Sequence, residues 1–174
     1  MISLLRNLAR HERGTVTIEL AIVAPVLAVL IIGIVDISMA YSHKLEIEQG
    51  AQRAIEKVMQ TTGDTTVADT IKNEAVCQVN GTNADGSCAP GRLTTDDVTV
   101  TYRLECTDGG GVVSNSETDD ATIFDGYSCA PGSSEARYIM ATVRDVYTPM
   151  FPIHFGTDPD GTYHLGTTAG VRVQ

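Results

Sequence analysis

The sequence predicts an α+β fold, in which a long N-terminal helix, first membrane-spanning and then amphipathic, carries a small antiparallel β-sheet head. A charge-free run of 16 mostly apolar residues, 20–35, follows a basic leader. Apolar residues then recur at helical spacing as far as about residue 62. Three later segments alternate apolar and polar residues, as half-buried strands do. We therefore expect a leader at 1–14, a long helix at 15–62 and an extracytoplasmic head at 63–174.

The basic leader has the wrong order for an ordinary secretory signal. It contains Arg6, Arg10 and Arg13 but only short apolar clusters. A secretory signal places its apolar core before the cleavage site, whereas here the apolar run begins after Gly14. Ordinary signal-peptide removal is therefore not expected.

Residues 18–41 are expected to cross a membrane. At a rise of 1.5 Å per residue they reach roughly 36 Å, which exceeds the hydrocarbon core of about 30 Å. Arginines precede the segment, while Lys44 beyond it is offset by Glu46 and Glu48. This bias predicts a single pass of the cytoplasmic membrane, with the N-terminus in the cytoplasm and the head outside.

Three residues of this span are unusual. A charge at the centre of a membrane helix costs about 2.5–3.5 kcal/mol, and less near the interface, so Glu19 should have a partner. Pro25 either bends the helix or is a tolerated membrane proline, and both interpretations stay open. Asp36 lies near the outer end, where we expect its carboxylate to reach water.

The helix continues beyond the membrane as an amphipathic stalk at 42–62, in which Gly50 is a candidate bend. Its apolar stripe is expected to pack under the head and consists of Leu45, Ile47, Ala51, Ala54, Ile55, Val58 and Met59. Residues 66–76 read as a second helix, with Thr66 as a candidate N-cap. Residues 80–91 are rich in Gly, Asn and Asp and read as a loop.

Three strands are expected at 97–105, 137–147 and 163–173, each with apolar residues at every second position. They should form an antiparallel sheet that packs its apolar face on the outer half of the long helix. Residues 108–126 read as a long polar loop. Residues 147–155 combine aromatic residues and prolines, and read either as a buried crossover or as a contact surface for a neighbouring subunit.

All four cysteines lie in the head, and they indicate two disulfides formed in an oxidising compartment. Zinc sites need closely spaced pairs, whereas the gaps here are ten, seventeen and twenty-two residues. Each Ser-Cys-Ala-Pro-Gly turn follows an earlier cysteine across a glycine-rich loop. Of the three possible pairings we favour Cys77–Cys88 and Cys106–Cys129.

Charge and motifs argue against several functions. Residues 60–174 carry 16 acidic and 6 basic side chains, which accounts for the whole net charge of −10. Nucleic-acid binding is disfavoured, because phosphate contacts are made chiefly by Lys and Arg. No nucleophile, phosphate-loop or metalloprotease motif occurs, and the turn between His154 and His164 lacks the closing Glu of a calcium loop. We expect no enzyme activity, metal or cofactor.

The string ERGTVTIELAIVAPVLAVLIIGIVDISMAY resembles the TadE-like minor pseudopilins of tight-adherence (Flp/Tad) type IV-like pilus systems. Gly14 followed by Glu19 and an apolar helix is similar to a prepilin processing site. Ala21 and Pro25 fit the family's A-x-x-x-P step. The segment YTPMFP at 147–152 and the C-terminal residues 165–172 also look like this family.

The resemblance implies a pilin-like structural or assembly subunit of a Tad pilus. A membrane-embedded prepilin peptidase would cut between Gly14 and Thr15, and the new amine of Thr15 would pair with Glu19 of the same or a neighbouring subunit. The implied partners are that peptidase, other pilins or pseudopilins, and the Tad assembly platform in the inner membrane. Many pilins have Phe where this chain has Thr15. The alternative is an unprocessed single-pass anchor that displays a binding or adhesive domain, and a periplasmic enzyme ranks third.

Overall fold

The computed structural model describes residues 12–60, 67–151 and 155–173, with the backbone alone for residues 12–16. The expected leader residues 1–11, the cap Thr66 and His154 lie outside the described residues. The elements in chain order are the helices and strands α2 (Glu12–Gln60), α3 (Val67–Asn80), β1 (Val98–Thr107), β2 (Val113–Thr118), α4 (Ala121–Asp125), β3 (Ser134–Tyr147) and β4 (Tyr163–Arg172), with a 3-10 turn at Thr95–Asp97 before β1.

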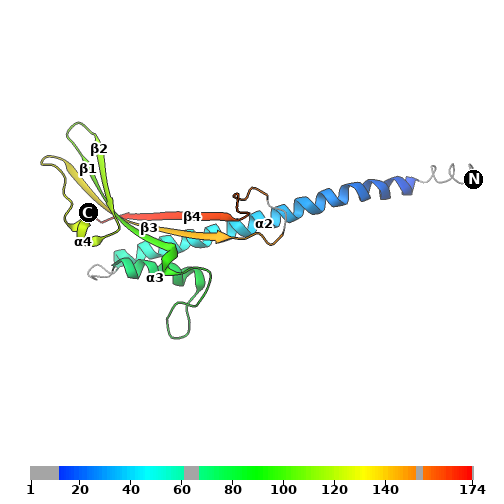
Figure 1. Cartoon of the computed structure of the whole chain (residues 1–174), viewed down its shortest axis with the longest axis horizontal. Coiled ribbons are helices and arrows are strands. Elements are labelled where there is room, and N and C mark those ends of the chain that lie inside the picture. Colours follow the sequence, from blue (N-terminus) through cyan, green and yellow to red (C-terminus); the bar gives the residue numbers. More distant parts are fainter. Residues whose placement is uncertain (1–11, 61–66, 152–154, 174) are drawn as a thin grey trace, which may run out of the picture.

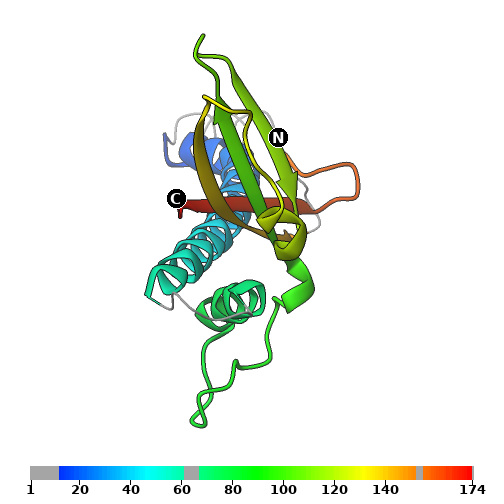
Figure 2. The same cartoon turned by 90° about the vertical axis from the view of Figure 1, so that its left-hand side faces the viewer.

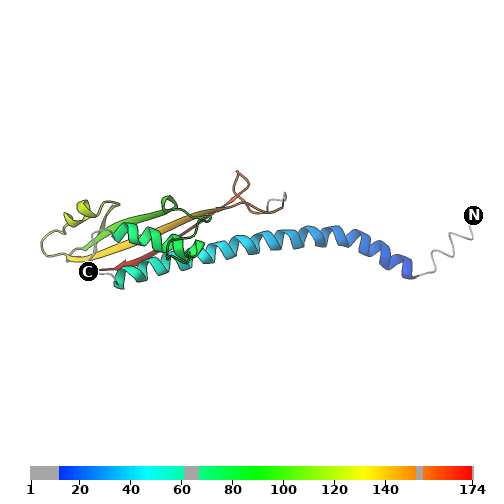
Figure 3. The ribbon, with the colours of Figure 1, turned by 90° about the horizontal axis from the view of Figure 1, so that it is seen from below.

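The helix α2 runs for 49 residues without interruption, past Pro25 and into the head. Its N-terminal half projects away from the rest of the molecule, and its far half lies along the sheet (Figures 1 and 3). Residues 17–31 are exposed on every side of the helix. Within the described residues it is the one helix that is long and apolar enough to cross a membrane.

The head contains a four-stranded antiparallel sheet in the order β2-β1-β3-β4. Val98 pairs with Val143, and Tyr147 pairs with Tyr163 at the end nearest the N-terminal half of α2. Seen along the long axis of the molecule, α2 and α3 lie next to each other on one side of a strongly twisted sheet (Figure 2). The α+β fold predicted from the sequence is confirmed.

One hydrophobic core joins the sheet to the two helices: β3 and β4 contact α2, and β1 contacts α3. Of the expected stripe on α2, Ile47, Ala51, Ala54, Ile55 and Val58 are buried. Leu45 and Met59 were expected there but are 39% and 56% exposed. Burial follows the narrower line of residues 47, 51, 54, 55 and 58, and these two side chains point away from that line.

The prediction of a single loop at 108–126 is wrong. This segment contains strand β2, which pairs with β1, and the short helix α4. Five of the six residues of β2 are exposed, because it is an edge strand and neither α2 nor α3 packs against it closely. Asp120 caps α4 by accepting hydrogen bonds from the amides of Thr122 and Ile123.

Gly50 is a packing contact between α2 and α3, and α2 is not interrupted there. A Cβ atom at this position would lie 3.0 Å from Cγ2 of Val79 and 3.1 Å from the carbonyl oxygen of Ala75. The absence of a side chain therefore lets the two helices approach closely.

The disulfides are Cys77–Cys88 and Cys106–Cys129, the pairing that the sequence favoured. The first fastens the loop after α3 back onto that helix. The second joins β1 to the segment between α4 and β3. Both therefore act within the head, and neither links it to α2.

Candidate functional site

The expected cleavage site lies near the start of the described part of α2. The helix begins at Glu12 in the described residues, so the peptide bond between Gly14 and Thr15 has a helical backbone. The side chains of both residues belong to the range for which only the backbone is described.

Glu19 and Pro25 are both exposed, and neither contacts the head. The salt bridges within the described residues include none to Glu19. Its carboxylate therefore faces outward from a helix whose neighbouring side chains are apolar, such as Ile18 and Leu20, which are 64% and 62% exposed.

Asp36 of α2 makes a polar contact with the head. Its carboxylate is only 2% exposed, so the expectation that it reaches water is wrong. Its Oδ1 accepts a hydrogen bond from the backbone amide of Met150, at 3.0 Å. The chain that follows β3 covers this face of the helix and separates the carboxylate from solvent.

Tyr147, the last residue of β3, lies beside Asp36 in the same contact. Its hydroxyl and Oδ2 of Asp36 are both buried, and neither has a hydrogen-bond partner among the described residues. Burial raises the pKa of the Tyr147 hydroxyl, and the nearby Asp36 carboxylate raises it further. The tyrosine therefore remains neutral beside the acid.

Phe155 packs on α2 one helical turn before Asp36. A Cβ atom at Gly33 would lie 2.9 Å from Cδ2 of the Phe155 ring, so the ring rests on the bare backbone of the helix. The carbonyl of Phe155 accepts a hydrogen bond from the hydroxyl of Tyr163, at the start of β4. The chain between β3 and β4 thus contacts α2 at Gly33 through Phe155 and at Asp36 through Met150.

A second charged group lies farther along α2, around Asp145 of β3. Asp145 is 7% exposed, and its Oδ2 lies 2.8 Å from Nε of Arg92, although the N–H is not aligned for a hydrogen bond. Arg92 also pairs with Glu46 at 2.7 Å, and Nδ1 of His43 lies 3.7 Å from Asp145. We call the whole contact the helix–head junction. It comprises Gly33, Asp36, His43 and Glu46 of α2 and Arg92, Asp145, Tyr147, Met150 and Phe155 of the head.

The predicted turn before β4 is held by its own side chains. Asp160 contacts Nε2 of His164 at 2.7 Å and accepts a hydrogen bond from the amide of Thr162. The contact with His164 comes first among the causes that lower the pKa of Asp160 to about 2, and it raises the pKa of His164. In the described part of the chain no group of His, Cys, Asp and Glu is arranged to hold a metal ion.

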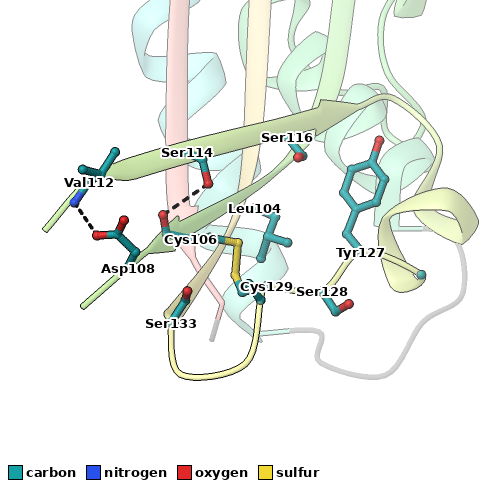
Figure 4. Close-up of a pocket in the computed structure, with 12 residues that line it drawn as sticks. Leu104, Cys106, Asp108, Val112, Ser114, Ser116, Tyr127, Ser128, Cys129 and Ser133 are labelled. Carbon is teal, nitrogen blue, oxygen red and sulfur yellow. Dashed lines mark hydrogen bonds between the residues drawn. A yellow bond between two sulfur atoms is a disulfide. The ribbon is translucent and has the colours of Figure 1, made fainter. Parts of the chain in front are cut away.

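An open cavity of about 550 Å³ lies at the end of the head far from the N-terminus of α2. The Cys106–Cys129 disulfide forms part of its wall, together with Tyr127 and the serines of β2 (Figure 4). Its one acidic residue, Asp108, already accepts hydrogen bonds from the amides of Gly110 and Val112. The lining therefore offers mainly hydroxyl groups and no charge that lacks a partner.

From the sequence we selected the expected cleavage site at Gly14 and Thr15 but missed the helix–head junction. The partners at the junction are far apart in the chain, and no local pattern connects them. The one available signal was the placement of Asp36 in an apolar helix, since acids there usually face protein and pair with it.

Comparison of the chain with protein families gives a match to the TadE-like protein family over residues 14–55. The matched range begins at Gly14 and ends within the buried part of α2. It agrees with the TadE-like resemblance of the N-terminal string. Comparisons with curated proteins and with solved structures gave no match.

Proposed function

We propose that this chain is a minor pseudopilin, a structural or assembly subunit of a Tad (Flp) pilus. One observation carries the proposal: the match to the TadE-like family covers residues 14–55. This range contains the expected cleavage site after Gly14 and the exposed apolar half of α2. TadE-like proteins belong to Tad pilus systems, so the coarse assignment to pilus structure or assembly rests on the family. The particular role within the pilus is our inference.

In this proposal the chain is inserted with its N-terminus in the cytoplasm and its head in the periplasm or outside the cell. A prepilin peptidase then removes residues 1–14. Proteases bind extended substrates, so the helical backbone of α2 would have to open at Gly14. The mature chain would begin at Thr15, in a helix that the head already holds at its other end.

Glu19 would then have a partner. The new amine of Thr15 is positive and lies one helical turn from this carboxylate, and opposite charges attract strongly where water is scarce. The exposure of Glu19 leaves it equally open to the amine of a neighbouring subunit. The other pilins or pseudopilins and the Tad platform of the inner membrane are the partners that would meet this face.

The direct test is N-terminal sequencing and intact-mass measurement of the full chain, purified from membranes with and without a co-expressed prepilin peptidase. We expect Thr15 as the first residue only when the peptidase is present. Gly14→Val should block the cut, because a branched side chain obstructs an extended substrate at this position. Ala28→Val is the matched control, since it makes the same kind of change farther along the exposed helix, and it should be cut normally.

Recovery of Met1 in the presence of an active peptidase would refute the processing step. That outcome would favour the alternative of an unprocessed anchor that displays the head as a binding domain. The account of the carboxylate has its own test: Glu19→Ala should be cleaved but should fail to co-purify with other pilus subunits. Normal assembly of Glu19→Ala would leave processing intact and remove the proposed ion pair.

A further inference from the structure

The exposed part of α2 is too short to cross a membrane before the head begins to cover it. A hydrocarbon core of about 30 Å requires about 20 helical residues. Counting from Ile18, where the expected span begins, this length ends at Ile37. The helix–head junction, however, already begins at Gly33. If α2 spans the bilayer, its outer part must therefore enter the membrane together with the segment packed on it.

That segment is the crossover, defined as residues 148–162 between β3 and β4, of which 148–151 and 155–162 are described. It extends along α2 beyond the ends of both strands, towards the N-terminal half of the helix (Figures 1 and 3). Two of its apolar side chains are exposed: Met150 is 68% exposed, and Phe155, one side of whose ring packs on Gly33, is 38% exposed. They continue the apolar surface of α2, where Ile34 and Ile37 are 67% and 51% exposed.

The charges in this region are arranged as a membrane requires. Asp36 is the one charged residue among positions 20–42, and the crossover covers it almost completely. Positions 147–157 contain no Asp, Glu, Lys or Arg. Acids inside membranes face protein and pair with it, often with backbone groups, as Asp36 does with the amide of Met150.

Two backbone groups of the crossover that lie next to α2 are satisfied, which favours a boundary with lipid, where a free amide or carbonyl is costly. The amide of Met150 is bonded to Asp36, and the carbonyl of Phe155 is bonded to Tyr163. Pro149 has no amide hydrogen to satisfy. Tyr41, 61% exposed on α2, supplies the kind of aromatic side chain that gathers at the membrane surface.

We propose that the crossover inserts Met150 and Phe155 into the outer leaflet beside α2, at the boundary between lipid headgroups and acyl chains. The inference rests on the membrane-spanning part of the proposed function and is independent of processing or pilus assembly. The occupant of this apolar surface is lipid. The head is thereby attached to the membrane at two places, through α2 and through the crossover.

The chain contains no Trp, so a single introduced Trp reports its own surroundings. Three sites have nearly the same exposure in the structure: Ile22 at 67%, Met150 at 68% and Val112 at 66%. Ile22 lies in the exposed part of α2, and Val112 lies in the head, in the turn just before β2. Each would be replaced by Trp in the full chain and reconstituted in phosphatidylcholine vesicles with lipids brominated either near the headgroup or near the chain ends.

We expect Ile22→Trp to be quenched most by deep bromine and Met150→Trp most by shallow bromine, with emission shifted to the blue in both. Val112→Trp should keep the emission of a Trp in water and show no quenching. Quenching of Ile22→Trp alone, with Met150→Trp behaving like Val112→Trp, would overturn the inference while leaving α2 in the membrane.

A blue-shifted but unquenched Met150→Trp would also overturn it, since protein and not lipid would then cover the crossover. Loss of quenching at Ile22→Trp would refute the membrane span itself, and with it this inference.

Discussion

The backbone amide of Met150 donates a hydrogen bond to Oδ1 of Asp36 over 3.0 Å, across a separation of 114 residues in the chain. The Asp36 carboxylate is shielded from water, and the contact ties the segment after β3 to the outer part of the apolar span of α2. The acid in the helix thereby serves as an acceptor for the head.

Asp36→Ala should destabilise this contact, because it leaves the Met150 amide without its acceptor. The expected loss is about 1–3 kcal/mol in the free energy of unfolding, the usual cost of a buried donor without a partner. Urea unfolding in detergent micelles, followed by circular dichroism, would measure it. Asp36→Asn keeps an acceptor oxygen and should lose less, and Ile37→Ala, at an exposed neighbour, controls for the change in the helix. Equal stability of Asp36→Ala and the wild type would contradict the role of this hydrogen bond.

Arg92→Ala should cost about 3–5 kcal/mol in unfolding free energy, since it leaves the buried Asp145 carboxylate without its nearest cation. Arg53→Ala is the matched control. It breaks the pair with Glu56, whose side chains are 62% and 57% exposed, and such pairs contribute at most about 1 kcal/mol. The same unfolding assay would compare the two variants. Similar losses in both would show that the Arg92 pair is not a structural tie.

Gly50→Val should separate α2 from α3. The new side chain would press on Val79 and on the Ala75 carbonyl, and overpacking of this kind costs about 1–3 kcal/mol. Gln52→Val places the same β-branched residue at an exposed position of the same helix, so it reports the helix-propensity part of the effect alone. The difference between their unfolding free energies isolates the packing term, and a difference near zero would argue against close contact.

The Asp160–His164 pair should stabilise its turn only within a pH window. The folded pKa of His164 is raised, so its contribution is complete below the ordinary value of 6.5 and is lost as pH rises through the folded pKa. The pKa of Asp160 is lowered to about 2, so its contribution is present above 3.8 and is lost as pH falls towards 2.

NMR titration of the His164 ring should show this elevated pKa, which Asp160→Asn should bring back towards 6.5. Asp158→Asn is the control and should produce a smaller decrease, because the charge of Asp158 raises the pKa of His164 less than Asp160 does. A His164 pKa that does not change in Asp160→Asn would contradict the pairing.

The sequence was sufficient wherever burial follows a regular period. The buried line of Val98, Val100, Tyr102 and Leu104 has a period of two, and it was predicted together with the strand that carries it. The stripe on α2 was predicted for the same reason, but Leu45 and Met59 were wrongly included in it, because helical spacing alone does not fix the width of a buried stripe.

Period-based reasoning failed for β2 and for the junction. Val113–Thr118 is solvated on both faces, so it has no alternation to detect, and its pairing with β1 is determined by the neighbouring strand. The burial of Asp36 depends on a segment of the chain that comes after β3. No window of sequence around Asp36 contains Met150, so no local rule could identify the partner of this acid.

The continuity of α2 has a mechanical consequence. One unbroken helix supplies both the apolar span and a wall of the core of the head, and it has no hinge between them in the described residues. A pull or a twist applied to the N-terminal half would therefore be transmitted to the sheet as through a rigid lever. The direction in which the head faces is set by the rotation of the helix about its own axis.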